Sequence, residues 1–296
     1  MVDSGSACPR TAEIVGSGTA ARSNREAALC RNTRVPTAIE LGCADPAQPC
    51  RLPAGLQSDP YLKQVRSTSA EFGLRWRSGP GQSASLSAFR IDNRDDIVFG
   101  SVSATSQLGY FRNFPHTRNA GLDAAWDLRL GSLTVQLGAS WLEATYQASD
   151  TLRLSGRNVA VVPGMRVAGQ PRQILKAALD WQAAPGLSLG LDLQALSRRG
   201  VLGNEDGLAE DGNPNPVDLS LPGYTLLNLR ASWQPAPGWE LTARVANAAN
   251  RRYDSYGALA ETVFDARGGY TGEGRSAVFV APGAPRSLQF GARLRF

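Results

Sequence analysis

Four cysteines and one histidine are the residues of this chain whose types most often do chemistry. Cys43 and Cys50 stand in LGCADPAQPCRLP, and the six residues between them would close a small disulfide loop in an oxidising compartment. Free thiols are a second interpretation. A zinc site is a third, but it needs more ligands than one histidine and these cysteines offer. We take Cys43 and Cys50 as the disulfide candidate and expect no metal site.

No combination of side chains predicts catalysis. His116, in NFPHTRN, has no neighbouring Ser or Cys motif, so we interpret it as a structural or solvated residue. The stretch VGSGTA (15–20) lacks the Gly-Lys-Ser/Thr ending of a phosphate-binding loop. The acidic stretch 203–218 lacks EF-hand spacing and has the Gly, Asn and Pro content of a solvated loop. We therefore expect no catalytic residue and no cofactor, and we expect that the protein is not an enzyme.

The basic balance of the chain does not indicate nucleic-acid binding. The net charge is +5, and 29 of the 31 cationic residues are arginines. They are spread singly along the chain, whereas a nucleic-acid surface needs a dense basic patch. The sequence contains no run of about 18 apolar residues, which excludes helical membrane spans.

Alternation of apolar and polar residues with a period of two dominates the sequence from residue 67 onward. In LSLGLDLQ (187–194), for example, every second residue is leucine. This pattern predicts strands with one apolar and one polar face. Nine strands are predicted, over residues 67–77, 83–99, 108–129, 132–148, 171–183, 187–200, 223–234, 238–250 and 286–296.

Short and long connections alternate between these strands. Four tight turns lie near 79–81, 130–132, 184–186 and 236–238, and three of them contain Pro-Gly, which suits a type II turn. The connections near 149–170, 201–222 and 251–285 are long. Tight turns at one end, long loops at the other, and strands of 9–11 residues or more are typical of an outer-membrane β-barrel. A soluble β-sandwich also alternates but seldom sorts its loops by length.

A tryptophan precedes each of four turn glycines by five residues, and successive glycines are 50, 55 and 52 residues apart. Each of these tryptophans has the parity of the apolar face of its strand. Tryptophan at a membrane interface keeps its ring in lipid and its N–H toward water. A tryptophan that caps a soluble core is the other interpretation. We predict a membrane-interface girdle of Trp76, Trp126, Trp181, Trp233, Trp239 and Phe296, with Tyr110, Tyr146, Tyr224 and Tyr253 forming a second girdle.

Nine strands are difficult to close into a barrel. Bacterial single-chain barrels normally have an even number of strands, and an open sheet would expose unpaired backbone groups to lipid. We therefore expect either that the chain is the C-terminal part of a larger barrel or that residues 1–66 contain a tenth strand.

Several segments, in this order and spacing, resemble a TonB-dependent outer-membrane receptor. They are VPTAIELGCADPAQPCRLP, DPYLKQV, TSAEFGLRW, DNRDDIVFGS, GYFRNFPHTRNAGLD, PGYTLLNLRASW, VANAANRRYDSYG and the ending PGAPRSLQFGARLRF. VANAAN departs from the commoner Asn-Leu-Phe-Asp form of the family. The resemblance covers residues 34–296 and implies the C-terminal part of a 22-stranded antiparallel transmembrane β-barrel. Residues 1–30 match nothing in the family, residues 1–33 are expected to be an atypical or disordered segment, and no plug domain is expected.

The resemblance implies a function and partners. It implies TonB-energised uptake of an iron–siderophore or a similar large, scarce nutrient in the outer membrane of a Gram-negative bacterium. The expected partners are outer-membrane lipid, a siderophore-like ligand and, only if the full-length protein has a plug domain, the TonB complex. The alternatives are a small passive pore or structural barrel, a truncated non-functional gene product, and a soluble β-sandwich binding module.

Overall fold

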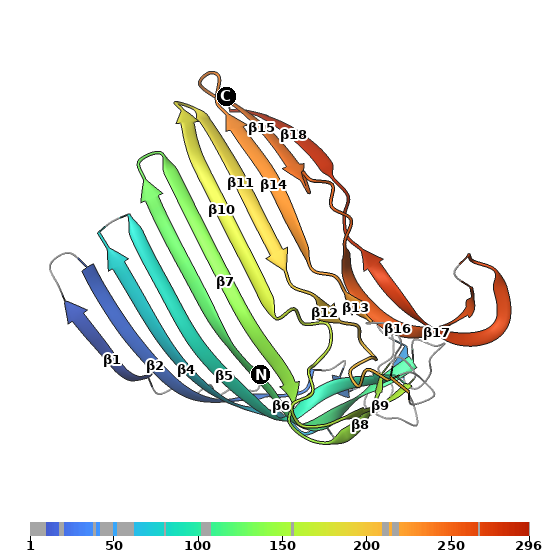
Figure 1. The fold of residues 1–296 in the computed structure, drawn as a ribbon. Helices are drawn as coiled ribbons and strands as arrows, with labels where there is room; N and C mark the ends of the chain where they lie inside the picture. Colours follow the sequence, from blue (N-terminus) through green and yellow to red (C-terminus); the bar gives the residue numbers. More distant parts are fainter. Residues whose placement is uncertain are drawn as a thin grey trace.

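A sheet of antiparallel strands dominates the structure. The computed structural model describes residues 10–17, 21–37, 40–41, 50–51, 62–79, 81–101, 108–154, 157–208, 213–214, 219–265 and 267–295. Within these ranges, 12 strands form one sheet, and three smaller two-stranded sheets accompany it (Figure 1). No helix in the described ranges is long and apolar enough to cross a membrane.

All nine predicted strands are present, with ends within a few residues of the prediction. Each pairs antiparallel with the next along the chain, so the alternation of the sequence becomes an alternation between the two faces of the sheet. The strands are β4 (Val65–Ser78), β5 (Gln82–Ser101), β6 (Leu108–Leu130), β7 (Leu133–Tyr146), β10 (Gln173–Ala184), β11 (Leu187–Leu196), β14 (Tyr224–Trp233), β15 (Trp239–Ala246) and β18 (Ser287–Leu294).

The sheet also extends into the segment that we had expected to be atypical or disordered. Strands β1 (Arg10–Ser17) and β2 (Ala21–Arg34) precede β4, and β2 pairs with β4 from end to end. This expectation was wrong for the residues of β1 and β2. The alternation was missed because Arg25 and Arg31 lie on the same face of β2 as Leu29 and interrupt its apolar pattern. A two-residue strand, β3 (Cys50–Arg51), pairs with β6.

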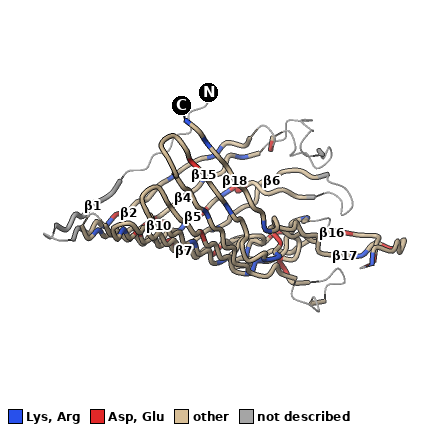
Figure 2. Tube along the Cα trace, turned by 90° about the horizontal axis from the view of Figure 1, so that it is seen from above, with Lys and Arg blue, Asp and Glu red and all other residues tan. Residues whose placement is uncertain are grey.

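Within the described strands the sheet is open and curved. Its path runs β1-β2-β4-β5-β6-β7-β10-β11-β14-β15-β18, so β1 and β18 are its two edges. Seen from above, the strands follow a curve, and the hairpin of β16 (Asp254–Phe264) and β17 (Tyr270–Pro282) projects beyond it (Figure 2). A transmembrane sheet needs partners for both edges, because unpaired backbone groups are costly in lipid.

The long connections contain structure that the sequence interpretation assigned to loops. Strands β8 (Asp150–Leu154) and β9 (Arg157–Val161) form one hairpin, and β16 (Asp254–Phe264) and β17 (Tyr270–Pro282) form a longer one. The two-residue strands β12 (Arg199–Gly200) and β13 (Ser220–Leu221) also pair. The strands of the first hairpin and of the β12–β13 pair are five residues or fewer, too short for periodicity to identify them.

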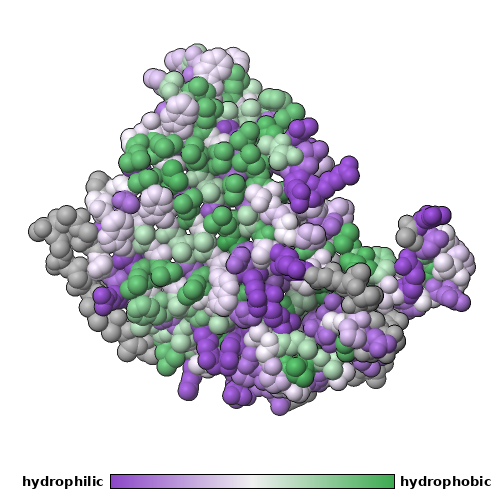
Figure 3. Space-filling model, viewed as in Figure 1, coloured by the Kyte–Doolittle hydropathy of each residue, from purple (hydrophilic) through white to green (hydrophobic). Residues whose placement is uncertain are grey.

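The buried clusters lie at the end of the sheet opposite the tight turns, which we call the loop end. Beneath the β8–β9 hairpin, Phe114 and Val159 are fully buried. A second cluster joins Val201, Leu221 and Leu259. Along the sheet itself many large apolar side chains are exposed. In Figure 3 hydrophobic residues gather over the upper part of the sheet, and hydrophilic residues gather toward its lower rim. The sheet therefore has an apolar face that nothing in the described chain covers.

Candidate functional site

The predicted girdle tryptophans lie on the apolar face near the tight turns. Trp76, Trp181, Trp233 and Trp239 expose 37%, 46%, 50% and 45% of their surfaces, and Trp126 is partly buried. Their exposure shows that they do not cap a core within the described chain. Single exposed apolar residues are common, but a row of large ones on one face marks a contact surface.

The strand register places these five tryptophans on one oblique line. Trp76 and Trp126 lie at the same level in the register. Each following tryptophan is displaced along its strand toward the tight turns relative to the one before it. The displacement is four residues for Trp181, two for Trp233 and two for Trp239. That is eight residues across seven strand pairings. With about 3.3 Å per residue and about 4.8 Å between strands, the line corresponds to a strand tilt of about 40°. Transmembrane barrels tilt their strands by about 35–45°.

Two of the four tyrosines predicted to form a second girdle, Tyr146 and Tyr224, do not lie on the face of the sheet that carries the tryptophans. Tyr146 is buried and packs edge-on against Phe114, with ring centroids 5.1 Å apart. Tyr224 packs against Tyr253 at 4.4 Å. Tyr146 and Tyr224 have the parity of the polar faces of their strands. The prediction used only their distance from the turns and ignored this parity. Phe296, at the other end, lies outside the described residues.

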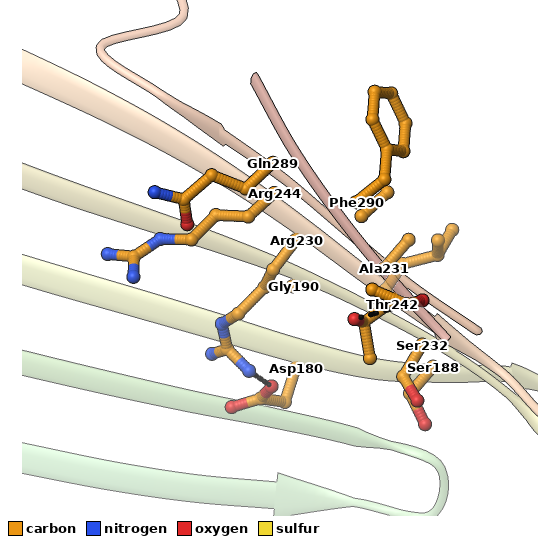
Figure 4. A pocket seen from close by; sticks show the side chains of 13 residues that line it. Asp180, Ser188, Gly190, Arg230, Ala231, Ser232, Thr242, Arg244, Gln289 and Phe290 are labelled. Carbon is orange, nitrogen blue, oxygen red and sulfur yellow. Dashed lines mark hydrogen bonds and ion pairs between the residues drawn. The ribbon is translucent and has the colours of Figure 1, made fainter. Parts of the chain in front are cut away.

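An arginine crosses three strands on the polar face of the sheet. The Arg230 guanidinium, from β14, passes over Gly190 of β11 and donates to Asp180 Oδ1 of β10 at 2.5 Å (Figure 4). Its Nε also donates to Asp192 Oδ2 at 3.2 Å. A Cβ atom at position 190 would lie 2.6 Å from the Arg230 side chain. Gly190 therefore makes room for this bridge, a role that the sequence interpretation did not assign to it.

Further charges line the same polar face. Arg244 of β15 lies opposite Arg230 in the register and makes no ion pair within the described chain. Arg293 lies 3.5 Å from Glu240, and Arg75 lies 3.6 Å from Glu26. Phe290 points to the other side of the sheet from Arg230 and Arg244 (Figure 4). The polar face can therefore hold polar groups, while the apolar face can only meet lipid or another apolar surface.

His116 belongs to an ion-pair cluster and not to a catalytic arrangement. Its Nε2 lies 3.0 Å from Asp92 Oδ1, which also accepts from Arg118 Nε at 2.8 Å. Arg90 Nε donates to the other carboxylate oxygen at 2.7 Å. The cluster contains no nucleophile, so it carries no arrangement of nucleophile and base. In the described parts of the chain, no group of acidic, histidine or cysteine side chains is arranged to hold a metal ion.

Asn247 joins three segments at the loop end. Its Nδ2 donates to the carbonyl oxygens of Arg251 and Ala284, at 2.9 and 3.1 Å, and its Oδ1 accepts from the Arg251 backbone N–H. Its own N–H donates to Asn228 Oδ1. It is buried and has a φ of 48°, which asparagine tolerates better than most residues. This residue lies in the VANAAN motif, where the sequence interpretation assigned no role to it.

A short strap, residues 201–208, covers part of the loop end. Arg157 from β9 pairs with Asp206 and donates to the Gly203 carbonyl oxygen. The Glu205 Oε2 accepts from the Gly203 N–H at 3.0 Å, while its Oε1 is buried without a hydrogen bond. Burial raises the pKa of the Glu205 carboxyl to about 7.

The cysteines are described only in part. Cys30, on β2, is buried and disulfide-bonded. Cys43 lies outside the described residues, and only the backbone of Cys50 is described, in β3. The pairing of Cys43 with Cys50 stays a prediction.

The comparison with protein families gives one match. The family described as TonB dependent receptor-like, beta-barrel, matches residues 26–248. This range begins eight residues earlier than the resemblance seen in the sequence and includes part of β2. TonB-dependent receptors are outer-membrane transporters of Gram-negative bacteria and are not enzymes. No curated protein matches the chain.

Solved structures of the same architecture align along nearly the whole chain. The ferric-catecholate import receptor Fiu from E. coli K12 is 14% identical, with a TM-score of 0.56, over 93% of this chain and 34% of its own. The siderophore receptor PiuA from Acinetobacter baumannii is 11% identical, with a TM-score of 0.61, over 93% of this chain and 35% of its own. The copper transporter OprC is 17% identical, with a TM-score of 0.62, over 95% of this chain and 38% of its own. The chain thus spans somewhat more than a third of their length, and the likeness concerns the fold.

Proposed function

Because the chain belongs to the TonB-dependent receptor family, we propose that it is part of the barrel of an outer-membrane receptor for a large, scarce nutrient. The nutrient that we propose is an iron–siderophore complex, taken up with energy from TonB. The observation that carries the proposal is the family match over residues 26–248. Solved structures of similar fold include siderophore, iron and copper transporters, which support the general class of cargo.

The two faces of the sheet support placement in a membrane. The oblique row of Trp76, Trp126, Trp181, Trp233 and Trp239 becomes level when the strands tilt by about 40°, as they do in transmembrane barrels. We propose that this row lies at one membrane interface and that the loop end faces the cell exterior. The apolar face then contacts lipid, and the polar face with Arg230 and Arg244 faces the barrel interior.

The open sheet favours the large receptor barrel over a small passive pore. Among the described strands, β18 pairs with β15 alone, and β1 pairs with β2 alone. A small closed barrel needs these two edges to pair with each other. In the larger barrel the edges pair with further strands, so the open sheet is what part of a larger barrel requires.

Deletion of the gene in its own bacterium tests the proposal. Under iron starvation we expect the deletion strain to lose uptake of at least one ⁵⁵Fe-labelled siderophore, and a TonB-deletion strain to lose the same uptake. Restoring the gene should restore the uptake only where TonB is present. Unchanged uptake of every labelled complex in the deletion strain would contradict the proposed cargo. Uptake that persists without TonB would favour a passive pore.

A further inference from the structure

A cavity of about 500 Å³ opens at the loop end, between the start of β14 and the two segments that Asn247 holds together. Its size is within the range of small-molecule sites. Two aromatic rings and two arginines are among the residues that line it. The lining residues used here are Tyr224, Arg251, Arg252, Tyr253, Asp254 and Gly283.

The two tyrosine rings form one side of an aromatic site. Tyr224 and Tyr253 have ring centroids 4.4 Å apart with their planes tilted by 39°. Tyr253 lies so close to Gly283 that a Cβ atom there would be 2.0 Å from its ring. The absence of a side chain at position 283 therefore gives the Tyr253 ring its place. Aromatic faces of this kind stack on flat rings.

A buried cation lies over the Tyr224 ring of this aromatic pair. Arg199 is 6% exposed, and its guanidinium carbon lies 5.6 Å from the centre of the Tyr224 ring. Its Nη2 donates to the Asp254 backbone oxygen at 2.7 Å. In the described chain it forms no ion pair with a carboxylate. Buried charges are normally paired, because removing an ion from water is costly. A ring and a carbonyl oxygen offset the charge of Arg199 only in part, so the positive potential around it favours an anion nearby.

The mouth of the cavity carries the same sign of charge. Arg251 and Arg252 are exposed and form no ion pair within the described residues. Asp254 is the acidic residue of the described lining, so the lining has one excess positive charge and Arg199 adds another. Guanidinium groups pair with carboxylates through two parallel hydrogen bonds and also stack on planar groups.

We propose that this cavity binds an anionic group carried on a planar ring. Tyr224 and Tyr253 contact the ring, Arg251 and Arg252 pair with the anion, and the buried charge of Arg199 stabilises it from behind. The inference rests on the proposed function, because it assigns the loop end to the side where cargo arrives. It can be tested apart from transport, since binding in detergent requires neither TonB nor an energised membrane.

The test measures binding of salicylate to the full chain in detergent micelles by saturation-transfer NMR. Cyclohexanecarboxylate supplies the charge without the flat ring, and benzyl alcohol supplies the ring without the charge. We expect salicylate to bind at least about tenfold more tightly than either, a difference of about 1.4 kcal/mol. Equal binding of salicylate and cyclohexanecarboxylate would overturn the role of the rings, and no binding of salicylate would overturn the site.

Substitutions locate the binding. Arg251→Gln with Arg252→Gln changes exposed residues and is expected to weaken salicylate binding at least about tenfold. The matched control is Arg129→Gln with Arg267→Gln, which removes the same charge from two exposed arginines outside the cavity. Arg199→Gln is expected to weaken salicylate binding by a similar factor. If that variant does not fold, the double variant at Arg251 and Arg252 tests the proposal. Equal loss in the control and cavity variants would show that only net charge matters and would overturn the proposal.

Discussion

The turn end and the loop end of the sheet hold their aromatic residues in opposite ways. At the turn end, Trp181 and Trp233 expose 46% and 50% of their surfaces, and no buried cluster lies among the described residues there. At the loop end, Phe114 is 0% exposed beneath a hairpin, and Tyr146 packs against it. The first arrangement leaves apolar surface that nothing in the described chain covers, while the second builds a small water-excluding core. In the proposed membrane placement, the turn end contacts lipid and the loop end contacts water.

The largest effect is expected from removing a core side chain at the loop end. Phe114→Ala should lower the free energy of unfolding by about 3–5 kcal/mol, because it leaves a cavity that the β8–β9 hairpin cannot fill. Phe72→Ala is the matched control, since Phe72 is 49% exposed on the apolar face. Its cost should be about 1 kcal/mol, from lost contacts with lipid. Urea unfolding in lipid vesicles measures both, and equal costs would remove the distinction between the two ends.

The second prediction tests the depth of the apolar face. Leu193 lies on the apolar face of β11, four residues from the register partner of Trp181 toward the loop end. Leu193→Arg should therefore cost about 2–4 kcal/mol in a bilayer, and Trp181→Arg about 0–1 kcal/mol at the interface. Unfolding in vesicles measures the two values. A larger cost at position 181 than at 193 would place the membrane interface elsewhere.

The third prediction concerns pH and the strap over residues 201–208. The pKa of Glu205 rises from 4.5 to about 7 on burial, so its stabilising contribution is fully present below pH 4.5 and is lost as the pH rises through 7. The difference between these two pKa values corresponds to about 3 kcal/mol. Glu205→Gln keeps the shape without the charge. At pH 8 its Gly203 and Leu208 amides should exchange about tenfold more slowly than those of the wild type. Equal exchange at pH 8 would contradict the assignment.

The smallest effect is expected on the polar face. Gly190→Ala should displace the Arg230 guanidinium from Asp180 and cost about 1 kcal/mol, because the three side chains are each more than 40% exposed and solvent weakens the pair. Gly138→Ala is the control, since a Cβ atom there meets nothing within 4 Å. Urea unfolding gives the difference. A larger loss for Gly138→Ala would show that backbone effects outweigh the bridge.

The sequence was most informative where side chains repeat along one strand. The leucines of 187–193 indicate their strand because each adds to the same period, and the tryptophans near the turns share the parity of their strands. It was least informative where a residue acts across strands. Nothing in GNEDG distinguishes the buried Glu205 from a solvated loop residue, and nothing in LSLGLDL shows that Arg230 crosses Gly190.

The sequence by itself determined nine strands of the large sheet, their two faces and the sorting of short turns from long loops, because these depend on neighbours along the chain. Only the tertiary structure decided the continuation of the sheet through β2, the core under the β8–β9 hairpin and the cavity beside Tyr224 and Tyr253. Each of these joins segments that are distant in the sequence. Arg199 and Asp254, for example, meet across 55 residues, a separation that no local pattern records.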